Sequence, residues 1–443
     1  MDILIQASQF ILSLSLLIVL HEMGHFIPAK LFKTKVEKFY LFFDPWFSVF
    51  KKKIGGTEYG IGWLPLGGYV KIAGMIDESM DKEQMQQPPQ PWEFRSKPAW
   101  QRLIIMVGGV TVNVILAMVI YAGMLMYYGE EYLPNENLKY GITADSTAQA
   151  LGFRDGDRVV AVGDKKIERF SDISLEILLG DKGDITVERN GSTEEFSISA
   201  DQKSRIIDSQ KSLVGVRMPF VVAEVVDSSA AAAAGLMAGD SLTGVNGQNM
   251  AYYHEYPQYL KDKAGEEITL SFVRGGEPMQ AVLQIPGEGE MKGAMGVLAH
   301  PIDRYVDFSY TRYGFFEAIP AGIQKSGKVL TDYVRQFKLI ANPETGAYKH
   351  VGGFLMIANQ YSTDWDWQRF WAFTAFLSIM LAFLNILPIP ALDGGHVVFV
   401  LWEMITGRKP PEKVLEYAQI VGFVILLALI VLANGNDILK LFK

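Results

Sequence analysis

The chain has 443 residues, of which 49% are hydrophobic, and it contains no cysteine. The absence of cysteine excludes disulfides, a thiolate nucleophile and cysteine metal ligands, so any metal site must use His, Asp or Glu. The formal net charge of −8 gives no reason to expect nucleic acid as a partner.

Four apolar stretches are long enough to cross a bilayer, whose apolar core needs about 20 helical residues. We expect transmembrane helices within residues 1–28, 99–126, 367–396 and 415–435. The first stretch could also be a signal peptide. It lacks a basic start and a small-residue cleavage site, which favours a retained span.

Basic residues are distributed unevenly around these spans. Residues 30–53 contain seven Lys, and Arg408, Lys409 and Lys413 follow the third span, whereas residues 129–310 hold 17 Lys and Arg against 29 Asp and Glu. Because basic loops remain in the cytoplasm, we expect the loops after the first and third spans to lie inside. Both termini and the long middle region are then expected outside.

The middle region contains a repeat with an offset of 83 residues. The matched pairs are Gly152 and Gly235, Gly156 and Gly239, Asp157 and Asp240, and Val162 and Val245. Gly-Asp before an alternating apolar run predicts a tight turn followed by a half-buried strand. The pattern resembles that of PDZ domains, which implies two small β domains at residues 127–218 and 219–306. Such domains bind extended peptides at a strand edge; spacers without a ligand are the alternative.

Three further regions connect these parts. Residues 29–98 contain β-branched and aromatic runs separated by glycines, which predict strands. Residues 307–366 mix aromatic and basic residues at helical spacing, typical of an amphipathic helix on a membrane surface or of a soluble linker helix. Residues 397–414 are expected to form a loop, and residues 436–443 a tail.

The most informative stretch is His21-Glu22-Met23-Gly24-His25. His21 and His25 are four residues apart, so they share one face of a helix and can bind one Zn²⁺, while Glu22 can accept a proton from water. Ionisable residues that continue an apolar span are functional candidates. Three other histidines lack a spaced partner and are expected in surface loops: His254, His300 and His350.

A catalytic zinc usually takes a third protein ligand and keeps one position open. Asp393 follows two prolines, Pro388 and Pro390, at the end of the third span. A helix break at these prolines would turn Asp393 towards the metal. His396 is a rival ligand that would share a face with Asp393 in a continuous helix; Gly394 and its neighbouring glycine make a continuous helix less favourable, which favours Asp393.

Together these motifs resemble the site-2 protease family of intramembrane zinc metalloproteases, in particular its regulator of sigma-E protease (RseP) type. The resemblance covers nearly the whole chain and includes the run from Asn385 through Asp393 to Gly394. It implies that His21, His25 and Asp393 bind Zn²⁺ and that Glu22 is the general base. The residues that it places near the substrate are Asn113, Asn385, Pro388, Pro390 and Gly394; Val110 stands where the family pattern has Pro.

The resemblance also implies a fold and a function. The fold would be a multi-pass α-helical membrane protein with four transmembrane helices, a membrane-associated β-hairpin region that engages the substrate as an added strand, and two PDZ-like domains that screen substrates. Its place would be the bacterial inner membrane, with the PDZ-like domains in the periplasm and the active site towards the cytoplasm. The implied substrates are single-span membrane proteins such as anti-sigma factors, or remnant signal peptides. A membrane zinc transporter and a non-catalytic PDZ scaffold are the alternatives.

Overall fold

The computed structural model describes residues 2–65, 67–75, 87–209, 212–289 and 292–441. The chain divides into two compact units. The helical unit comprises Met1–Glu130, Arg312–Asn342 and Ala347–Lys443, and the β unit comprises Glu131–Thr311 and Pro343–Gly346. Each unit is described by itself below.

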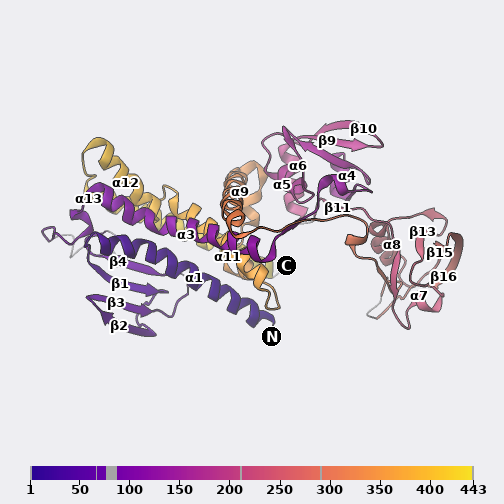
Figure 1. Cartoon of the computed structure of the whole chain (residues 1–443), viewed down its shortest axis with the longest axis horizontal. Helices are drawn as coiled ribbons and strands as arrows, with labels where there is room; N and C mark the ends of the chain where they lie inside the picture. Colours follow the sequence, from indigo (N-terminus) through magenta and orange to yellow (C-terminus); the bar gives the residue numbers. More distant parts are fainter. Residues whose placement is uncertain (1, 66, 76–86, 210–211, 290–291, 442–443) are drawn as a thin grey trace. The chain divides into compact units, whose positions relative to one another are not determined.

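Four helices of the helical unit are long and apolar enough to cross a membrane within the described part of the chain. They are α1 (Asp2–Leu31), α3 (Ala99–Tyr128), α11 (Trp367–Ile386) and α13 (Glu412–Leu441) (Figure 1). The expectation of a multi-pass membrane protein with β domains is therefore confirmed. Helices α1, α11 and α12 (Asp393–Thr406) all pack against α3, which is the centre of the unit.

Glycines allow α1 and α3 to approach closely. A Cβ atom added to Gly24 of α1 would lie 2.4 Å from the carbonyl oxygen of Gly108 of α3, and a Cβ on Gly108 would lie 1.9 Å from the oxygen of Gly24. No larger residue fits at either position without moving a backbone. Small residues at helix contacts are the usual means of close packing in membranes, where burial of apolar surface gives no driving force.

The helix breaks between α11 and α12, at the place where Pro388 and Pro390 predict a helix break within residues 367–396. Helix α11 ends at Ile386, and α12 begins at Asp393 and continues through both glycines. The glycines therefore do not end the helix. The sequence analysis disfavoured His396 as a ligand on the expectation that they would, so that reason is not supported. Instead, a Cβ on Gly394 would lie 2.2 Å from the oxygen of Leu387, so the absent side chain lets the loop fold onto the start of α12.

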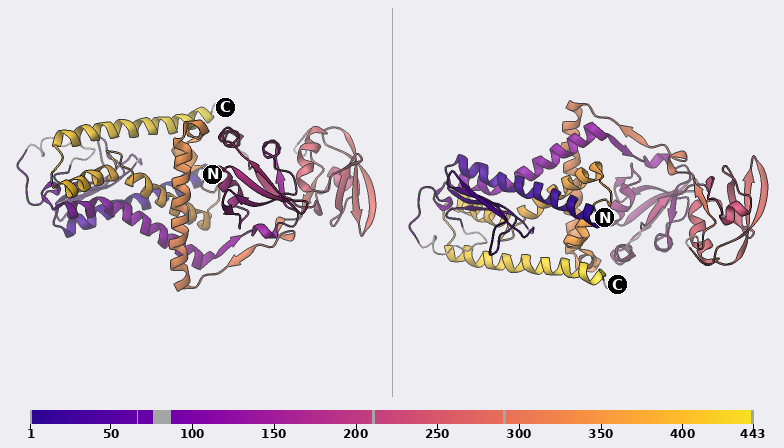
Figure 2. Two further views of the ribbon diagram at one scale, coloured as in Figure 1. Left: turned by 90° about the horizontal axis from the view of Figure 1, so that it is seen from above. Right: turned by 90° about the horizontal axis from the view of Figure 1, so that it is seen from below.

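The linker helix α9 (Phe315–Ala341) belongs to the helical unit and packs against α3 and α11. It runs across α3 rather than along it (Figure 2). A Cβ on Gly322 would lie 2.6 Å from the backbone nitrogen of Ala122, so this contact is also a close backbone approach. Helix α13 is the most exposed span, and its last turns hold the short helix α10 (Phe354–Ala358) through hydrogen bonds from the α10 backbone to Asn434 and Asp437.

A four-stranded sheet lies beside α1, in the order β2-β3-β1-β4. Its strands are β1 (Val36–Leu41), β2 (Phe50–Ile54), β3 (Thr57–Ile61) and β4 (Tyr69–Ile72). β1 pairs with β3 in parallel and with β4 in antiparallel fashion. The face carrying Phe39 and Tyr59 covers α1, because both rings contact Phe26 at 5.5 and 6.0 Å between centroids.

The β unit contains two domains, each with its own hydrophobic core. The first domain consists of α4 (Ser146–Leu151), α5 (Asp172–Leu179), α6 (Ala200–Ser209), β6 (Ile142–Ala144), β7 (Arg158–Val162), β8 (Lys165–Lys166), β9 (Asp184–Arg189), β10 (Ser192–Ser197) and β11 (Val214–Val216). The second consists of α7 (Ala230–Ala233), α8 (Tyr256–Asp262), β12 (Val222–Val225), β13 (Ser241–Val245), β14 (Gln248–Asn249), β15 (Glu267–Arg274), β16 (Glu277–Gln284) and β17 (Val297–Ala299). The chain enters through β5 (Glu130–Tyr132) and leaves through β18 (Ser309–Thr311), which pair with each other.

The two domains repeat each other in topology and in one buried ion pair. Their main sheets have the equivalent orders β10-β9-β7-β8 and β14-β13-β15-β16 read from opposite ends. In the first, Arg189 donates to both carboxylate oxygens of Asp157 and to the carbonyl of Gly152. In the second, Arg274 makes the same three bonds to Asp240 and to the carbonyl of Gly235. The aspartates of the Gly-Asp repeat are thus the fully buried partners of a bidentate arginine in each domain.

Candidate active site

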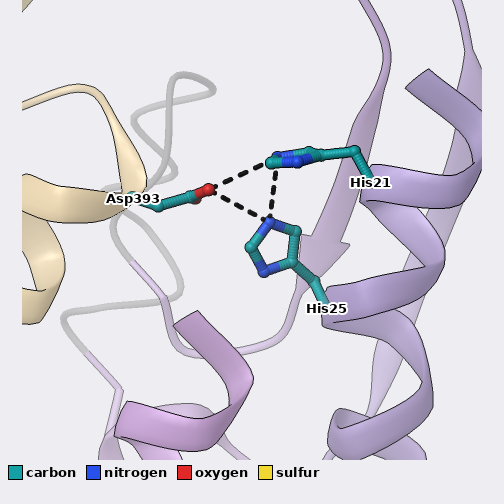
Figure 3. A group of neighbouring side chains, drawn as sticks. All are labelled: His21, His25 and Asp393. Atoms are coloured by element: carbon teal, nitrogen blue, oxygen red, sulfur yellow. Dashed lines mark hydrogen bonds and ion pairs between the residues drawn. The ribbon is translucent and has the colours of Figure 1, made fainter. Parts of the chain in front are cut away.

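Three donor atoms from two helices meet inside the helical unit. His21 and His25 point from successive turns of α1 towards Asp393 in the first turn of α12 (Figure 3). Oδ2 of Asp393 lies 3.3 Å from Nε2 of each histidine, and the two Nε2 atoms are 3.3 Å apart. Within the described residues, this is the group of side chains that could hold a metal ion.

The geometry of this triangle fits zinc. Ligand bonds of about 2.0–2.1 Å in a tetrahedral arrangement require the ligand atoms to be roughly 3.3 Å apart. Oδ2 of Asp393 is buried and has no hydrogen-bond partner. A buried carboxylate oxygen without a donor is costly, and a cation between the three atoms would satisfy it.

The opposite ring nitrogens of both histidines have partners that orient the rings. Nδ1 of His25 lies 2.8 Å from the carbonyl oxygen of Ile105, so this nitrogen carries the proton and Nε2 is free to bind a metal. Nδ1 of His21 lies 3.1 Å from the amide nitrogen of Asn113, whose buried oxygen has no hydrogen-bond partner. With the amide turned so that this oxygen accepts a hydrogen bond from Nδ1–H, Nε2 of His21 carries no proton and also faces the metal position.

The backbone of α3 lies close beside the donor nitrogens of the two rings. A Cβ on Gly109 would lie 2.4 Å from Nε2 of His25 and 2.6 Å from Cε1 of His21. Our sequence analysis did not identify this contact, although two adjacent glycines within an apolar span were a signal for close helix packing. Ser378 of α11 donates to the carbonyl oxygen of Asn113 at 2.7 Å and ties the third helix to the same place.

Glu22 lies on α1 between the two histidines and is half-buried. It is close enough to His25, His21 and Asp393 to interact electrostatically with all three, and it contacts the backbone of Val70 in β4. A Cβ on Gly68 would lie 3.7 Å from Cγ of Glu22. The carboxylate is therefore placed between the donor triangle and the edge strand of the sheet.

The remaining residues singled out in the sequence surround this centre to different degrees. The amide nitrogen of Asn385, in the last turn of α11, lies 3.3 Å from Nε2 of His21. Pro388 and Pro390 lie in the loop before α12, where Ala391 has a φ of 84°, and Gly394 packs under this loop. His396 lines a small cavity of about 90 Å³ with residues such as Arg95 and Gln419, and does not join the donor triangle.

Comparison with known proteins identifies the family. Residues 9–429 match Peptidase family M50. The chain belongs to this family. The M50 relatives include the regulator of sigma-E protease RseP of Escherichia coli strain K12, which is 30% identical over 98% of both chains. Protease RseP of Yersinia pestis is 29% identical over the full length of both chains. A Rickettsia conorii relative whose name describes a zinc metalloprotease is 28% identical over 98% of both chains.

This membership means that the chain is a membrane-embedded zinc metalloprotease of the site-2 protease type, similar to RseP. The expectation of an enzyme that uses zinc is confirmed, and the transporter and scaffold alternatives are not supported. The family match spans α1, both β domains and α11 to α13, so the similarity includes every element that forms the site.

Proposed function

We propose that His21, His25 and Asp393 bind the catalytic zinc and that the enzyme cleaves single-span membrane proteins within the bilayer. The observation that carries this proposal is the triangle of donor atoms with 3.3 Å edges, closed by an unpartnered carboxylate oxygen. When bound, zinc supplies a Lewis acid that makes water more acidic and polarises a peptide carbonyl. The position of Asp393 at the start of α12 adds the positive end of the helix dipole to the stabilisation of its carboxylate.

Glu22 acts as the general base and acid in this proposal. It takes a proton from the attacking water and delivers it to the nitrogen of the leaving amine. Asn385 is placed to hydrogen-bond the backbone of the substrate, since its amide borders the donor triangle at His21. Asn113 holds the ring of His21 in the tautomer that leaves Nε2 available.

A transmembrane substrate has to unwind before its carbonyls can be attacked, because a helix hides them in internal hydrogen bonds. The edge strand β4 offers a partner for the unwound segment. It pairs with β1 on one side, and in the described residues no strand pairs with its other side. Because Val70 of β4 contacts Glu22, a peptide added to this edge would pass next to the catalytic carboxylate.

The β domains and the membrane orientation complete the proposal. The Gly-Asp repeat and the shared ion pair support the assignment of both β domains as PDZ-like domains, which would screen substrates outside the membrane. The lysine-rich loop after α1 supports placing the active site towards the cytoplasmic side of a bacterial inner membrane. The single-span substrates in this proposal are anti-sigma factors already trimmed by another protease, or remnant signal peptides.

Replacing Glu22 by Gln tests the catalytic assignment. Proton transfer by a positioned side chain contributes about 10²–10⁴-fold to rate, so Glu22→Gln should lower cleavage by at least that range while the protein keeps its zinc. The measurement follows a single-span substrate with both proteins in detergent, with and without a chelator, beside metal analysis. Undiminished cleavage by the Gln variant would exclude Glu22 as the base.

The third ligand is tested by metal content. Asp393→Ala should lose the ion, because two imidazoles alone leave the site one protein ligand short. His396→Ala is the matched control on the same helix and should bind zinc as the wild-type protein does. Loss of zinc from the His396 variant with retention in the Asp393 variant would reverse the assignment.

A further inference from the structure

The sheet next to α1 extends along the helix, so its two ends lie at different depths of a membrane span. At one end, Nζ of Lys30 donates to Oγ1 of Thr57 at the start of β3, at 2.8 Å. At the other, a Cβ on Gly68 would lie 2.5 Å from Ile18. The twelve residues between Ile18 and Lys30 correspond to roughly 18 Å of helix. One end of the sheet is therefore level with the polar end of α1, and the other with its apolar interior.

The deeper end is an aromatic tip formed by residues 42–49, 62–65 and 67–68. Trp63 stacks with Trp46 and Phe47 at centroid distances of 6.1 and 5.8 Å, and Trp46 is 92% exposed. The carboxylate of Asp44 in this tip accepts hydrogen bonds from Tyr69 and Ser48. The tip exposes apolar side chains, and its one carboxylate is hydrogen-bonded within the protein. Such a surface is suited to contact with the apolar part of a lipid bilayer.

The shallower end is basic on the face that points away from α1. The strand register places Lys53, Glu58, Lys38 and Lys71 in one row across the sheet, and Lys51 lies two residues from Lys53 on the same face. All of β2 is exposed. We use the name basic row for Lys38 and Lys53 of this row together with Lys51, which lies beside it on the same face.

The lysines on this face outnumber the acidic groups near them. Glu58 is the one carboxylate within the row and accepts a hydrogen bond from the hydroxyl of Tyr40, while Glu37 lies 3.9 Å from Lys71. In the part of the chain that the structure describes, Lys51 and Lys53 have neither an ion pair nor a hydrogen bond from their side chains. The row therefore presents a surplus of ammonium groups beside an apolar tip.

We propose that the basic row binds the phosphate groups of anionic phospholipids at the surface of the leaflet that the aromatic tip enters. The lipid contact fixes the depth of the sheet in the bilayer. Charge complementarity favours this partner, since each lysine close to an anionic membrane surface adds to binding. An acidic segment of the substrate is less suited, because β2 is three strands, or about 14 Å, from β4, the strand beside Glu22.

Lipid retention by the full-length protein tests this inference independently of catalysis. The protein is purified in mild detergent with equal amounts of phosphatidylglycerol and phosphatidylcholine, and the retained lipids are counted by native mass spectrometry. Lys51→Gln/Lys53→Gln should lower retention of phosphatidylglycerol by about fivefold or more, with no change for phosphatidylcholine. Lys51→Arg/Lys53→Arg should retain the anionic lipid because it keeps both charges.

The matched control is Lys261→Gln/Lys292→Gln, which removes two exposed lysines from the β unit and should leave lipid retention unchanged. If the Gln pair in β2 does not fold, a salt titration of the wild-type protein gives the same answer, since phosphate contacts weaken as salt rises. Equal retention of phosphatidylglycerol by the wild-type protein and the β2 variant would overturn the inference. A second result would also overturn it. The β2 variant would cleave only substrates with acidic flanks more slowly, and this defect would be the same in neutral and in anionic bilayers.

Discussion

Gly109 of α3 lies directly beside the donor nitrogens of the two imidazoles of the candidate zinc site. A Cβ at this position would lie within 2.6 Å of both rings, so Gly109→Ala has to displace His21, His25 or α3 itself. We expect zinc affinity to fall by about tenfold or more, as is usual when the support of a ligand is disturbed. Competition with a chromogenic chelator measures the affinity. Gly123→Ala on the same helix is the control, since a Cβ there meets nothing within 4 Å.

The histidine pair could be predicted from the sequence, whereas the residues that contact the two rings could not. His21 and His25 share a face because of the local period of a helix, which the sequence carries by itself. The contacts of Asn113 and Ile105 with the rings join residues that are 92 and 80 positions apart, respectively. Such contacts depend on how α1 and α3 cross, and the crossing depends on Gly24, Gly108 and Gly109 together.

At the scale of elements, one ion pair holds α12 against α3. Arg102 near the start of α3 donates to Glu403 in α12 at 2.5 Å, and both side chains are largely buried. Because α12 carries Asp393, this pair also maintains the distance between the carboxylate and the histidines. Glu403→Gln leaves the guanidinium without a counter-charge and should lower the free energy of unfolding by about 3 kcal/mol.

Denaturant unfolding in mixed micelles measures this loss. The control is Glu266→Gln, which breaks an exposed pair with Lys263 and should cost less than about 1 kcal/mol. If both substitutions cost the same, the Arg102–Glu403 pair does not hold the two helices together.

The boundaries of helices and strands could be predicted from the sequence only in part. The break before Asp393 was expected from Pro388 and Pro390, since both remove a backbone donor. The restart of a helix at Asp393 was not expected, because two glycines disfavour a helix by about 1 kcal/mol each. Close packing of the preceding loop against Gly394 outweighs that propensity. Likewise, the parallel pairing of β1 with β3 could not be deduced, because the strand signal of a single segment does not specify which strand it pairs with.

At the scale of the whole molecule, the two units have separate cores, so damage to one need not reach the other. Asp240 in the β unit provides a test through its ion pair with Arg274. Burial alone would raise the pKa of Asp240, but the hydrogen bonds from Arg274 and from the Met237 N–H outweigh burial and lower that pKa below its usual value. The ionised carboxylate therefore stabilises the second β domain above the unfolded-state pKa of about 3.9, and this stabilisation is lost as the pH falls through the lower folded-state pKa.

Asp240→Asn should accordingly accelerate hydrogen exchange in β13 and β15 by about tenfold at neutral pH, because the hydrogen bonds from the guanidinium of Arg274 lose their charged, buried acceptor. The difference from the wild-type protein should stay constant down to about pH 5 and shrink below about pH 4, where the carboxylate becomes protonated first in the unfolded state and, at lower pH, in the folded state. Zinc content should remain that of the wild-type protein at neutral pH, since the donor triangle lies in the helical unit. Loss of zinc together with the faster exchange would show instead that the two units unfold as one.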